Sequence, residues 1–275
     1  MPQDKYSAVW VSNSSINDFV TCPRLYFLRN VYKDPDTKHK INIINPSLAL
    51  GQTVHEVLEG LSVLPAEMRL KDSLPDKYNT AWEKVTGKLG GFRDAQEEEA
   101  VKERGEKMLK RVIDNPAPLL NKAIKIKQEL PNYYLSTDEN IILCGRIDWL
   151  EYITADDSVH IIDFKTGKYD ERSDSLQLPI YSLLVKNCQS KKVSKASYWY
   201  LDRNDEPTEV EPPSSEDAYN KVFALAKKVK QARFEGSYAC RKGGCRDCRP
   251  FEAILKKEAE FVGVGGYGQD MYILK

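Results

Sequence analysis

Two aspartates, a lysine and a histidine are the residues whose types and spacing could support chemistry. Asp148 closes the segment CGRID, and Asp163 and Lys165 lie in the later segment IIDFKTG. Residues two apart in a strand share a face, so these last two side chains should project together while Phe164 packs on the other face. If the segments form neighbouring strands, Asp148 approaches Asp163. Buried carboxylates are costly unless paired, and a divalent cation with oxygen ligands would pair them.

Hydrolysis of a phosphodiester is the chemistry expected of such a site. A bound Mg²⁺ or Mn²⁺ polarises the phosphate and lowers the pKa of a bound water. Lys165 can orient that water or stabilise developing negative charge. His55 could add an imidazole ligand, which Mn²⁺ accepts more readily than Mg²⁺. Each part has an ordinary alternative, because a D-x-K at a strand end is commonly a surface ion pair and a single helical histidine is commonly structural.

Gln177 and Tyr181, in SLQLPIYSLL, form a third feature. Four-residue spacing places both side chains on one face of a helix. That helix edge could contact a DNA strand and brace the site, or the tyrosine could pack in the core beside an incidental glutamine. The order of the patterns favours a functional site: G-x-x-x-H, G-x-x-D, D-x-K and then Q-x-x-x-Y.

Cysteines near the C-terminus indicate a second site. Three of the six lie within nine residues, in CRKGGCRDC. Clustering with C-x₂-C spacing indicates metal binding before disulfides, and three scattered core cysteines are the alternative. Cys144 and Cys188 lie in apolar segments and are predicted to be buried hydrophobes.

Periodicity predicts the elements that must position these residues. His55 lies beside the apolar stripe of an amphipathic helix and shares a helix edge with Glu59. The order of elements indicates a mixed sheet flanked by helices. The glycine-rich segment 263–268 gives no assignment. The predicted elements are a helix over 50–61, a charged helical block over 65–120, strands over 123–135, 140–153 and 158–165, a helix over 173–187, a strand over 194–201 and a helix over 216–234.

Length and composition restrict the class of protein. A chain of 275 residues can bury a core without disulfides, and no apolar run approaches 18 residues. Residues 1–10 lack the layout of a secretion signal, which favours a cytoplasmic location. Lys+Arg and Asp+Glu are equal at 41 each, so net charge does not indicate a nucleic-acid partner. Residues 221–257 nevertheless carry eleven Lys/Arg against three Asp/Glu, which suits a phosphate-tracking surface or a solvated helix face.

The segments GQTVHEVLEGL, ILCGRIDWLEY, VHIIDFKTGKYD and LQLPIYSLL together resemble the RecB-like branch of the PD-(D/E)xK nuclease superfamily. That branch includes nuclease modules of bacterial recombination enzymes and RecB-like nucleases of CRISPR adaptation. The resemblance spans about residues 14–249 outside the helical insertion. It implies an α/β fold with a restriction-endonuclease-like core, in which a mixed central β-sheet is flanked by helices. The implied division is 1–64 for the N-terminal helices of the nuclease domain, 65–122 for the helical insertion, 123–235 for the core sheet and helices, and 236–275 for the cysteine-rich C-terminal segment.

The resemblance also implies a role for each matched residue. The metal would be Mg²⁺ or Mn²⁺. The implied roles are metal ligands (His55, Asp148, Asp163 and the Phe164 carbonyl), a catalytic lysine (Lys165), a DNA-binding or supporting pair (Gln177 and Tyr181) and an extra acid on the strand before Asp148 (Glu129).

A [4Fe–4S] cluster is implied by the same resemblance, because many members hold one with a cysteine before the histidine motif and three near the C-terminus. Cys22, in TCPRLYFL, matches the first, and Cys240, Cys245 and Cys248 match the others. Four thiolates are what such a cluster needs. The sequence departs from the usual order, in which the extra cysteine follows the C-x₂-C pair; the later position falls near Ile254. A Cys₄ zinc site is the alternative.

The resemblance implies a divalent-metal-dependent deoxyribonuclease, expected to be an exonuclease on single-stranded or free-ended DNA, with a role such as DNA repair. A helicase could feed the site, and no membrane partner is expected. Three alternatives remain: trimming of DNA ends for CRISPR adaptation with an integrase partner, a non-catalytic DNA-binding module of the same fold, and a zinc-binding interaction protein with an incidental D-x-K.

Overall fold

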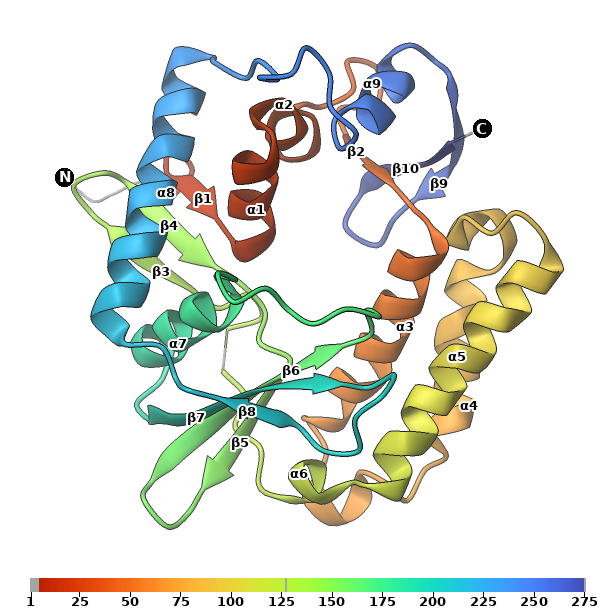
Figure 1. The fold of residues 1–275 in the computed structure, drawn as a ribbon, viewed down its shortest axis with the longest axis vertical. Coiled ribbons are helices and arrows are strands. Elements are labelled where there is room, and N and C mark those ends of the chain that lie inside the picture. The colour runs from red at the N-terminus through yellow and green to blue at the C-terminus, as the bar shows by residue number, and fades with distance from the viewer. Residues whose placement is uncertain (1–4, 127, 275) are drawn as a thin grey trace.

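A four-stranded mixed sheet lies at the centre of the computed structural model, which describes residues 5–126 and 128–274 (Figure 1). Strands β5 and β8 run antiparallel to their neighbours, whereas β6 and β7 are parallel. Helix α7 (Gln177–Cys188) connects the parallel pair, which needs a crossover rather than a hairpin. The strand order is β5 (Trp149–Ile153), β6 (Ser158–Lys165), β7 (Lys192–Tyr200) and β8 (Thr208–Val210).

Helices cover both faces of this sheet, so its central strands are apolar on both sides. On one face, Val159 and Ile161 pack with α7 and α8 (Ser215–Glu235). On the other, Ile162 and Phe164 pack with residues of three helices. These are α3 (Pro46–Leu61), α4 (Leu74–Trp82) and α5 (Ala95–Asp114). No helix in the described ranges has both the length and the apolar character needed to span a membrane.

Two further three-stranded sheets share no strand with the central one. The first has the order β1-β4-β3 and lies beside α1 and α8 (Figure 1). The second has the order β2-β10-β9 and contacts α9. Their elements are β1 (Val9–Val11), β4 (Ile141–Cys144), β3 (Asn132–Ser136) and α1 (Asn13–Thr21) in the first group, and β2 (Lys40–Ile43), β10 (Gln269–Leu274), β9 (Ala259–Val264) and α9 (Arg249–Leu255) in the second.

Short helices complete the chain. Most of them lie between 65 and 122, the block predicted to be helical, in which the described residues form helices and turns. They are α2 (Pro23–Tyr26), a π-helix (Phe27–Val31), 3₁₀ helices (Ala66–Met68, Glu83–Val85 and Gly87–Gly90) and α6 (Ala117–Leu120).

The mixed sheet flanked by helices is confirmed, but two strand predictions are wrong. Residues 140–153 form β4 and β5 in different sheets, separated by a break at 145–148. Of 123–135, only the end becomes β3. Apolar residues on both sides of the break conceal it in the sequence. Gly145 lies at the break, where a Cβ would come within 3.1 Å of Leu184 Cδ1.

Gly105 sets how closely α5 packs on its neighbours. A Cβ there would lie 2.0 Å from Tyr78 Oη and 2.9 Å from Leu50 Cδ1. Gly105→Ala is therefore expected to lower the free energy of unfolding by about 1–3 kcal/mol, because the helices must separate. Gly60→Ala, in α3, is the control: its Cβ contacts nothing within 4 Å, and stability should rise by up to about 1 kcal/mol. Urea denaturation measures both, and stabilisation by both would contradict the tight packing at Gly105.

Candidate functional site

The two aspartates meet at the end of the central sheet. β5 pairs with β6 so that Trp149 lies opposite Ile162, and continuing this register by one residue places Asp148 across from Asp163. Asp148 Oδ2 accepts a hydrogen bond of 2.9 Å from the Phe164 N–H, which fixes the carboxylate against β6. The Phe164 ring packs on the opposite face between two tryptophans, as the alternation along the strand predicts.

A nearby positive charge would stabilise the Asp163 carboxylate, which is buried beside Asp148. The side chain is fully buried. Burial and the neighbouring Asp148 raise the pKa of Asp163 to about 7, although Lys165 and His55 oppose the shift. A divalent cation bound beside Asp163 would offset both the burial of this carboxylate and its repulsion by Asp148.

His55 reaches the aspartates from α3. Its Nδ1 lies 3.4 Å from Asp148 Oδ2 and 3.8 Å from Glu59 Oε1, one turn further along the helix. These three residues offer ligand atoms that all lie within 4.8 Å of one another. Burial lowers the pKa of His55, but Asp148 and Glu59 outweigh it and raise the pKa to about 10. The imidazole thus lies in an acidic pocket that a metal ion could occupy in place of the proton.

Gly51, one turn before His55, lets α3 approach the sheet. A Cβ at this position would lie 3.3 Å from Thr166 Oγ1, in the loop that follows β6. Arg104 of α5 holds the same loop, because it donates to the Thr166 carbonyl at 2.8 Å and pairs with Asp202 at 2.9 Å. The G-x-x-x-H spacing is therefore a packing requirement that brings the imidazole to the carboxylates.

Lys165 occupies the same face of β6 as Asp163. Its Nζ lies 2.8 Å from Asp163 Oδ2 and 2.7 Å from Glu171 Oε2, and it donates to Gln177 Oε1 at 2.6 Å. Burial lowers the pKa of Lys165, but the two carboxylates outweigh it and raise the pKa above its ordinary value. Lys165 is therefore a fixed cation at neutral pH and not a proton acceptor.

Gln177, at the start of α7, joins the lysine to the aspartate. Its Nε2 donates to Asp163 Oδ1 at 2.5 Å and to Tyr181 Oη at 3.0 Å. The glutamine is thus part of the site's hydrogen-bond network rather than incidental. Tyr181 is buried, with only 6% of its surface exposed, so its position suits bracing of the site and leaves little surface for a DNA strand.

Glu129 is not on a strand, contrary to the sequence prediction. It is exposed in the loop before β3, where it lines a cavity together with Glu59 and Asp148. Two carboxylates of the site, Glu59 and Glu171, are absent from the predicted roles. The shared helix edge with His55 was a signal for Glu59, whereas Glu171 lies in an irregular loop and has no recognisable spacing.

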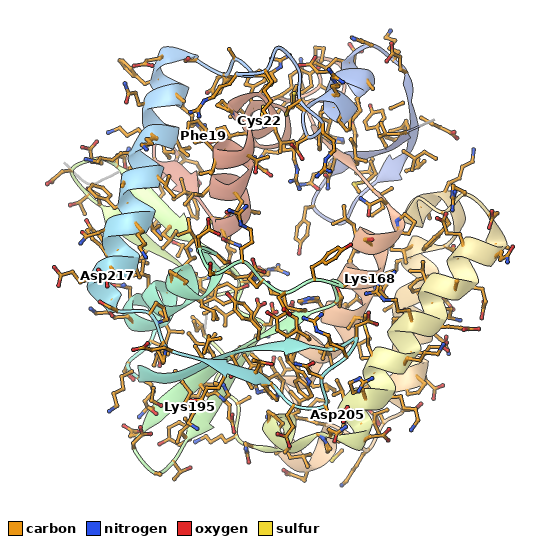
Figure 2. The ribbon with its side chains drawn as sticks, viewed as in Figure 1. Phe19, Cys22, Lys168, Lys195, Asp205 and Asp217 are labelled. Atoms are coloured by element: carbon orange, nitrogen blue, oxygen red, sulfur yellow. The ribbon has the colours of Figure 1, made fainter. Side chains whose placement is uncertain are left out.

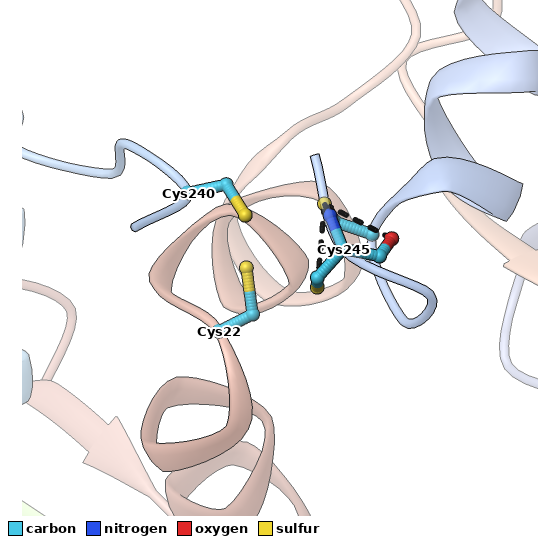
Figure 3. Close-up of side chains that lie close together, drawn as sticks. Cys22, Cys240 and Cys245 are labelled. Carbon is cyan, nitrogen blue, oxygen red and sulfur yellow. Dashed lines mark hydrogen bonds between the residues drawn. The ribbon is translucent and has the colours of Figure 1, made fainter. Parts of the chain in front are cut away.

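The four predicted cysteines lie close together at a second site. Their sulfur atoms are all within 4.8 Å of one another, and all four thiols are free. Figure 2 shows Cys22 well apart from Lys168, which is in the loop after β6. In Figure 3 the Cys22 and Cys240 side chains point towards each other from different segments. Cys22 lies between α1 and α2, and Cys248 precedes α9, so the site joins the two regions of chain.

The loop that contains Cys240 favours its thiolate. The backbone N–H groups of Lys242 and Gly244 donate to its sulfur and lower its pKa to about 6. Gly243 and Gly244 have φ of 61° and 121°, which residues with a Cβ rarely adopt. Burial instead raises the pKa of Cys248 to about 12. A soft metal that binds thiolates would hold both residues ionised, and four sulfur ligands suit zinc or an iron–sulfur cluster.

The predicted basic surface near the cysteines is partly neutralised. Arg24 pairs with Glu252 at 2.5 Å, and Arg29 pairs with Asp18 at 2.7 Å. A cavity of about 850 Å³ beside the cysteines combines cations with aromatic rings. Its lining includes Arg24, Arg249, Lys256, Phe27 and Tyr238.

Comparison with known protein families matches residues 11–252 to the PD-(D/E)XK nuclease superfamily. A search of curated proteins found no match. The matched span covers most of the chain and contains every residue of both sites. Members of this superfamily are typically metal-dependent nucleases that act on DNA, and the meeting of Asp148, Asp163 and Lys165 at one sheet end supplies the acidic and cationic groups of such a site. The family match and the geometry of the site agree, and the chain belongs to the PD-(D/E)XK nuclease superfamily.

Proposed function

We propose that the protein is a divalent-metal-dependent deoxyribonuclease that acts as an exonuclease on single-stranded or free-ended DNA. The observation that supports it best is the convergence of Asp148, Asp163 and Lys165 at the end of β6, with His55 beside them. Oxygen ligands with one imidazole suit Mn²⁺ or Mg²⁺. The proposed ligands are His55, Asp148, Asp163 and the Phe164 carbonyl, and Glu59 and Glu129 are the nearby acids.

Each residue of the site has a separate role in the proposed hydrolysis. When bound, the metal supplies polarisation of the phosphate and a more acidic water. Lys165 stabilises the negative charge that develops on the phosphate, because it is already charged and held in place. Gln177 keeps Lys165 and Asp163 in a fixed geometry, because its side chain forms a hydrogen bond with each of them, and Glu171 anchors the ammonium from the other side.

For the cysteines we propose a structural centre that connects the two regions of chain, a [4Fe–4S] cluster as the resemblance implies. One observation favours zinc as a second candidate. Cys245 Sγ and Cys248 Sγ lie 3.6 Å apart. Sulfurs around one tetrahedral zinc with Zn–S of about 2.3 Å lie roughly 3.8 Å apart. Iron, acid-labile sulfide and zinc analysis of anaerobically purified protein distinguishes the two.

A cleavage assay tests the proposed nuclease. Anaerobically purified protein is incubated with end-labelled linear single-stranded DNA or a closed single-stranded circle, in Mn²⁺, Mg²⁺ or EDTA. We expect metal-dependent loss of the linear strand alone. Loss of the circle as well would contradict the exonuclease mode. Binding without cleavage would contradict an enzyme that acts alone. It would favour either end trimming that depends on an integrase partner or a non-catalytic DNA-binding module. Adding the integrase distinguishes the two, because only the first would then cleave DNA.

A further inference from the structure

A cavity of about 310 Å³ lies against the candidate site, and several of its lining residues have no role in the proposal above. Three carboxylates line the side of the cavity nearest the candidate metal ligands: Glu59, Glu129 and Asp148. Ile147 and Leu150 contribute apolar surface, and Lys125 and Arg146 contribute cations. A small cavity that combines apolar walls with a few charged groups is typical of a site for one small ligand.

Arg146 is the best-placed cation of this cavity. It lies two residues before Asp148, in the break between β4 and β5, and its side chain is exposed. Among the described residues, no carboxylate is within salt-bridge distance of its guanidinium. An arginine free of carboxylates, next to candidate metal ligands, is suited to bind a phosphate with its fork of N–H donors.

The tip of the β9–β10 hairpin brings an aromatic ring to the same guanidinium. Arg146 Cζ lies 5.4 Å from the centroid of the Tyr267 ring. The Tyr267 side chain is otherwise open, with 75% of its surface exposed. A ring that contacts an arginine and leaves most of its surface free is a platform on which a base can stack.

The hairpin has a fixed position relative to the active site. β10 pairs with β2, and β2 leads directly into α3, which carries His55 (Figure 1). Buried Asp270 of β10 accepts a hydrogen bond of 2.6 Å from Thr37 Oγ1 and bonds to His39 Nδ1 at 2.8 Å. Gly268, with φ of 68°, turns the chain at the tip. Tyr267 therefore lies on an anchored support beside the cavity.

We infer that Arg146, which lines this cavity, and Tyr267, which contacts Arg146 from outside the lining, together bind the terminal nucleotide of a DNA strand: its phosphate binds Arg146 and its base stacks on Tyr267. The adjoining phosphodiester then lies beside Asp148, which also lines the cavity. This assignment rests on the proposed exonuclease function and adds to it the two residues that hold the strand end. The volume of about 310 Å³ is near the lower limit of small-ligand sites, which is room for about one nucleotide.

A binding experiment tests the stacking without cleavage. Asp163→Ala protein, with no added divalent metal, is titrated into single strands that carry 2-aminopurine at the 5′ end, at the 3′ end or in the middle. Stacking quenches this base, so we expect quenching at one end only, abolished by adding Tyr267→Ala and restored by Tyr267→Phe. Phe261→Ala, which removes another exposed ring of the same hairpin, should leave the quenching intact. Equal quenching in the middle, or quenching that survives Tyr267→Ala, would overturn the assignment.

Kinetics on the otherwise unchanged protein separate this inference from the proposed function. Loss of one base stack should raise KM for linear DNA about tenfold in Tyr267→Ala with little change in kcat, because the ring contacts no reacting atom. If the unchanged protein cleaves no DNA, the proposed function fails. If it cleaves and Tyr267→Ala has the same KM, only the terminal-nucleotide site fails.

Discussion

Asp163→Asn is expected to abolish DNA cleavage, by about 10³-fold or more, while the protein remains folded. The amide cannot supply the negative charge that a metal ligand needs, and a loss of about 4 kcal/mol of transition-state stabilisation corresponds to this factor. Initial rates of cleavage in Mn²⁺ measure the effect. Asp174→Asn is the control, because that aspartate is exposed and pairs only with Arg172 among the described contacts. Cleavage at the normal rate by Asp163→Asn would contradict the site assignment.

The same variant has an expected effect on stability in the absence of metal. The pKa of Asp163 is about 7 in the folded chain and about 3.9 in an unfolded one, so the folded state binds the proton more tightly. Ionisation of Asp163 therefore costs stability, and the contribution of this residue to stability should fall as the pH rises from about 4 to 7. The Asp163→Asn variant should lose less stability over that pH range, because the amide does not ionise. Thermal unfolding in EDTA across this interval measures the difference, and identical pH profiles would contradict the raised pKa.

Cys248→Ser is expected to release the metal centre and to lower the free energy of unfolding by about 3–5 kcal/mol. The centre connects Cys22 to the C-terminal region, so its loss resembles the removal of a crosslink that closes a long loop. Metal content per chain, visible absorbance and thermal unfolding measure the effect. Cys188→Ser is the control, because Cys188 lies outside the four-cysteine group.

The outcomes for this variant distinguish three cases. Loss of iron and sulfide with the visible colour would support a [4Fe–4S] cluster, whereas loss of zinc alone would support the tetrahedral site. Unchanged metal content and unchanged stability would contradict a structural centre of either kind.

Much of the candidate site could be predicted because its signals are local. The shared face of Asp163 and Lys165 follows from strand alternation, and the position of His55 follows from helical periodicity. The Gln177–Tyr181 contact follows from their four-residue spacing. The clustering of the C-terminal cysteines indicated metal binding, but adding Cys22 depended on the family resemblance rather than on any local pattern.

The remaining features depend on contacts between distant residues. β10 pairs with β2, more than 200 residues earlier, and a glycine-rich hairpin carries no sign of that partner. The strand prediction over 140–153 failed because β4 and β5 are both apolar, while membership of different sheets is decided by their partners. Glu171 reaches Lys165 from an irregular loop, whose path no periodicity describes. The division into four segments and the helicase or integrase partners remain predictions.

Two contacts join segments that are far apart in the sequence, so they form only late in protein synthesis. They are the pairing of β2 with β10 and the contact of Cys22 with Cys240. Both early segments leave the ribosome roughly 10–40 s before their partners, at synthesis rates of about 5–20 residues per second. During this interval β2, which leads into the His55 helix, has no neighbouring strand, and the core formed by Leu28, Ile41 and Phe251 is incomplete. The support of the active-site helix is therefore finished only when the region from 240 to 274 has been synthesised. A nascent chain stalled before that point would lack this support, so the candidate metal site would be completed only late in synthesis.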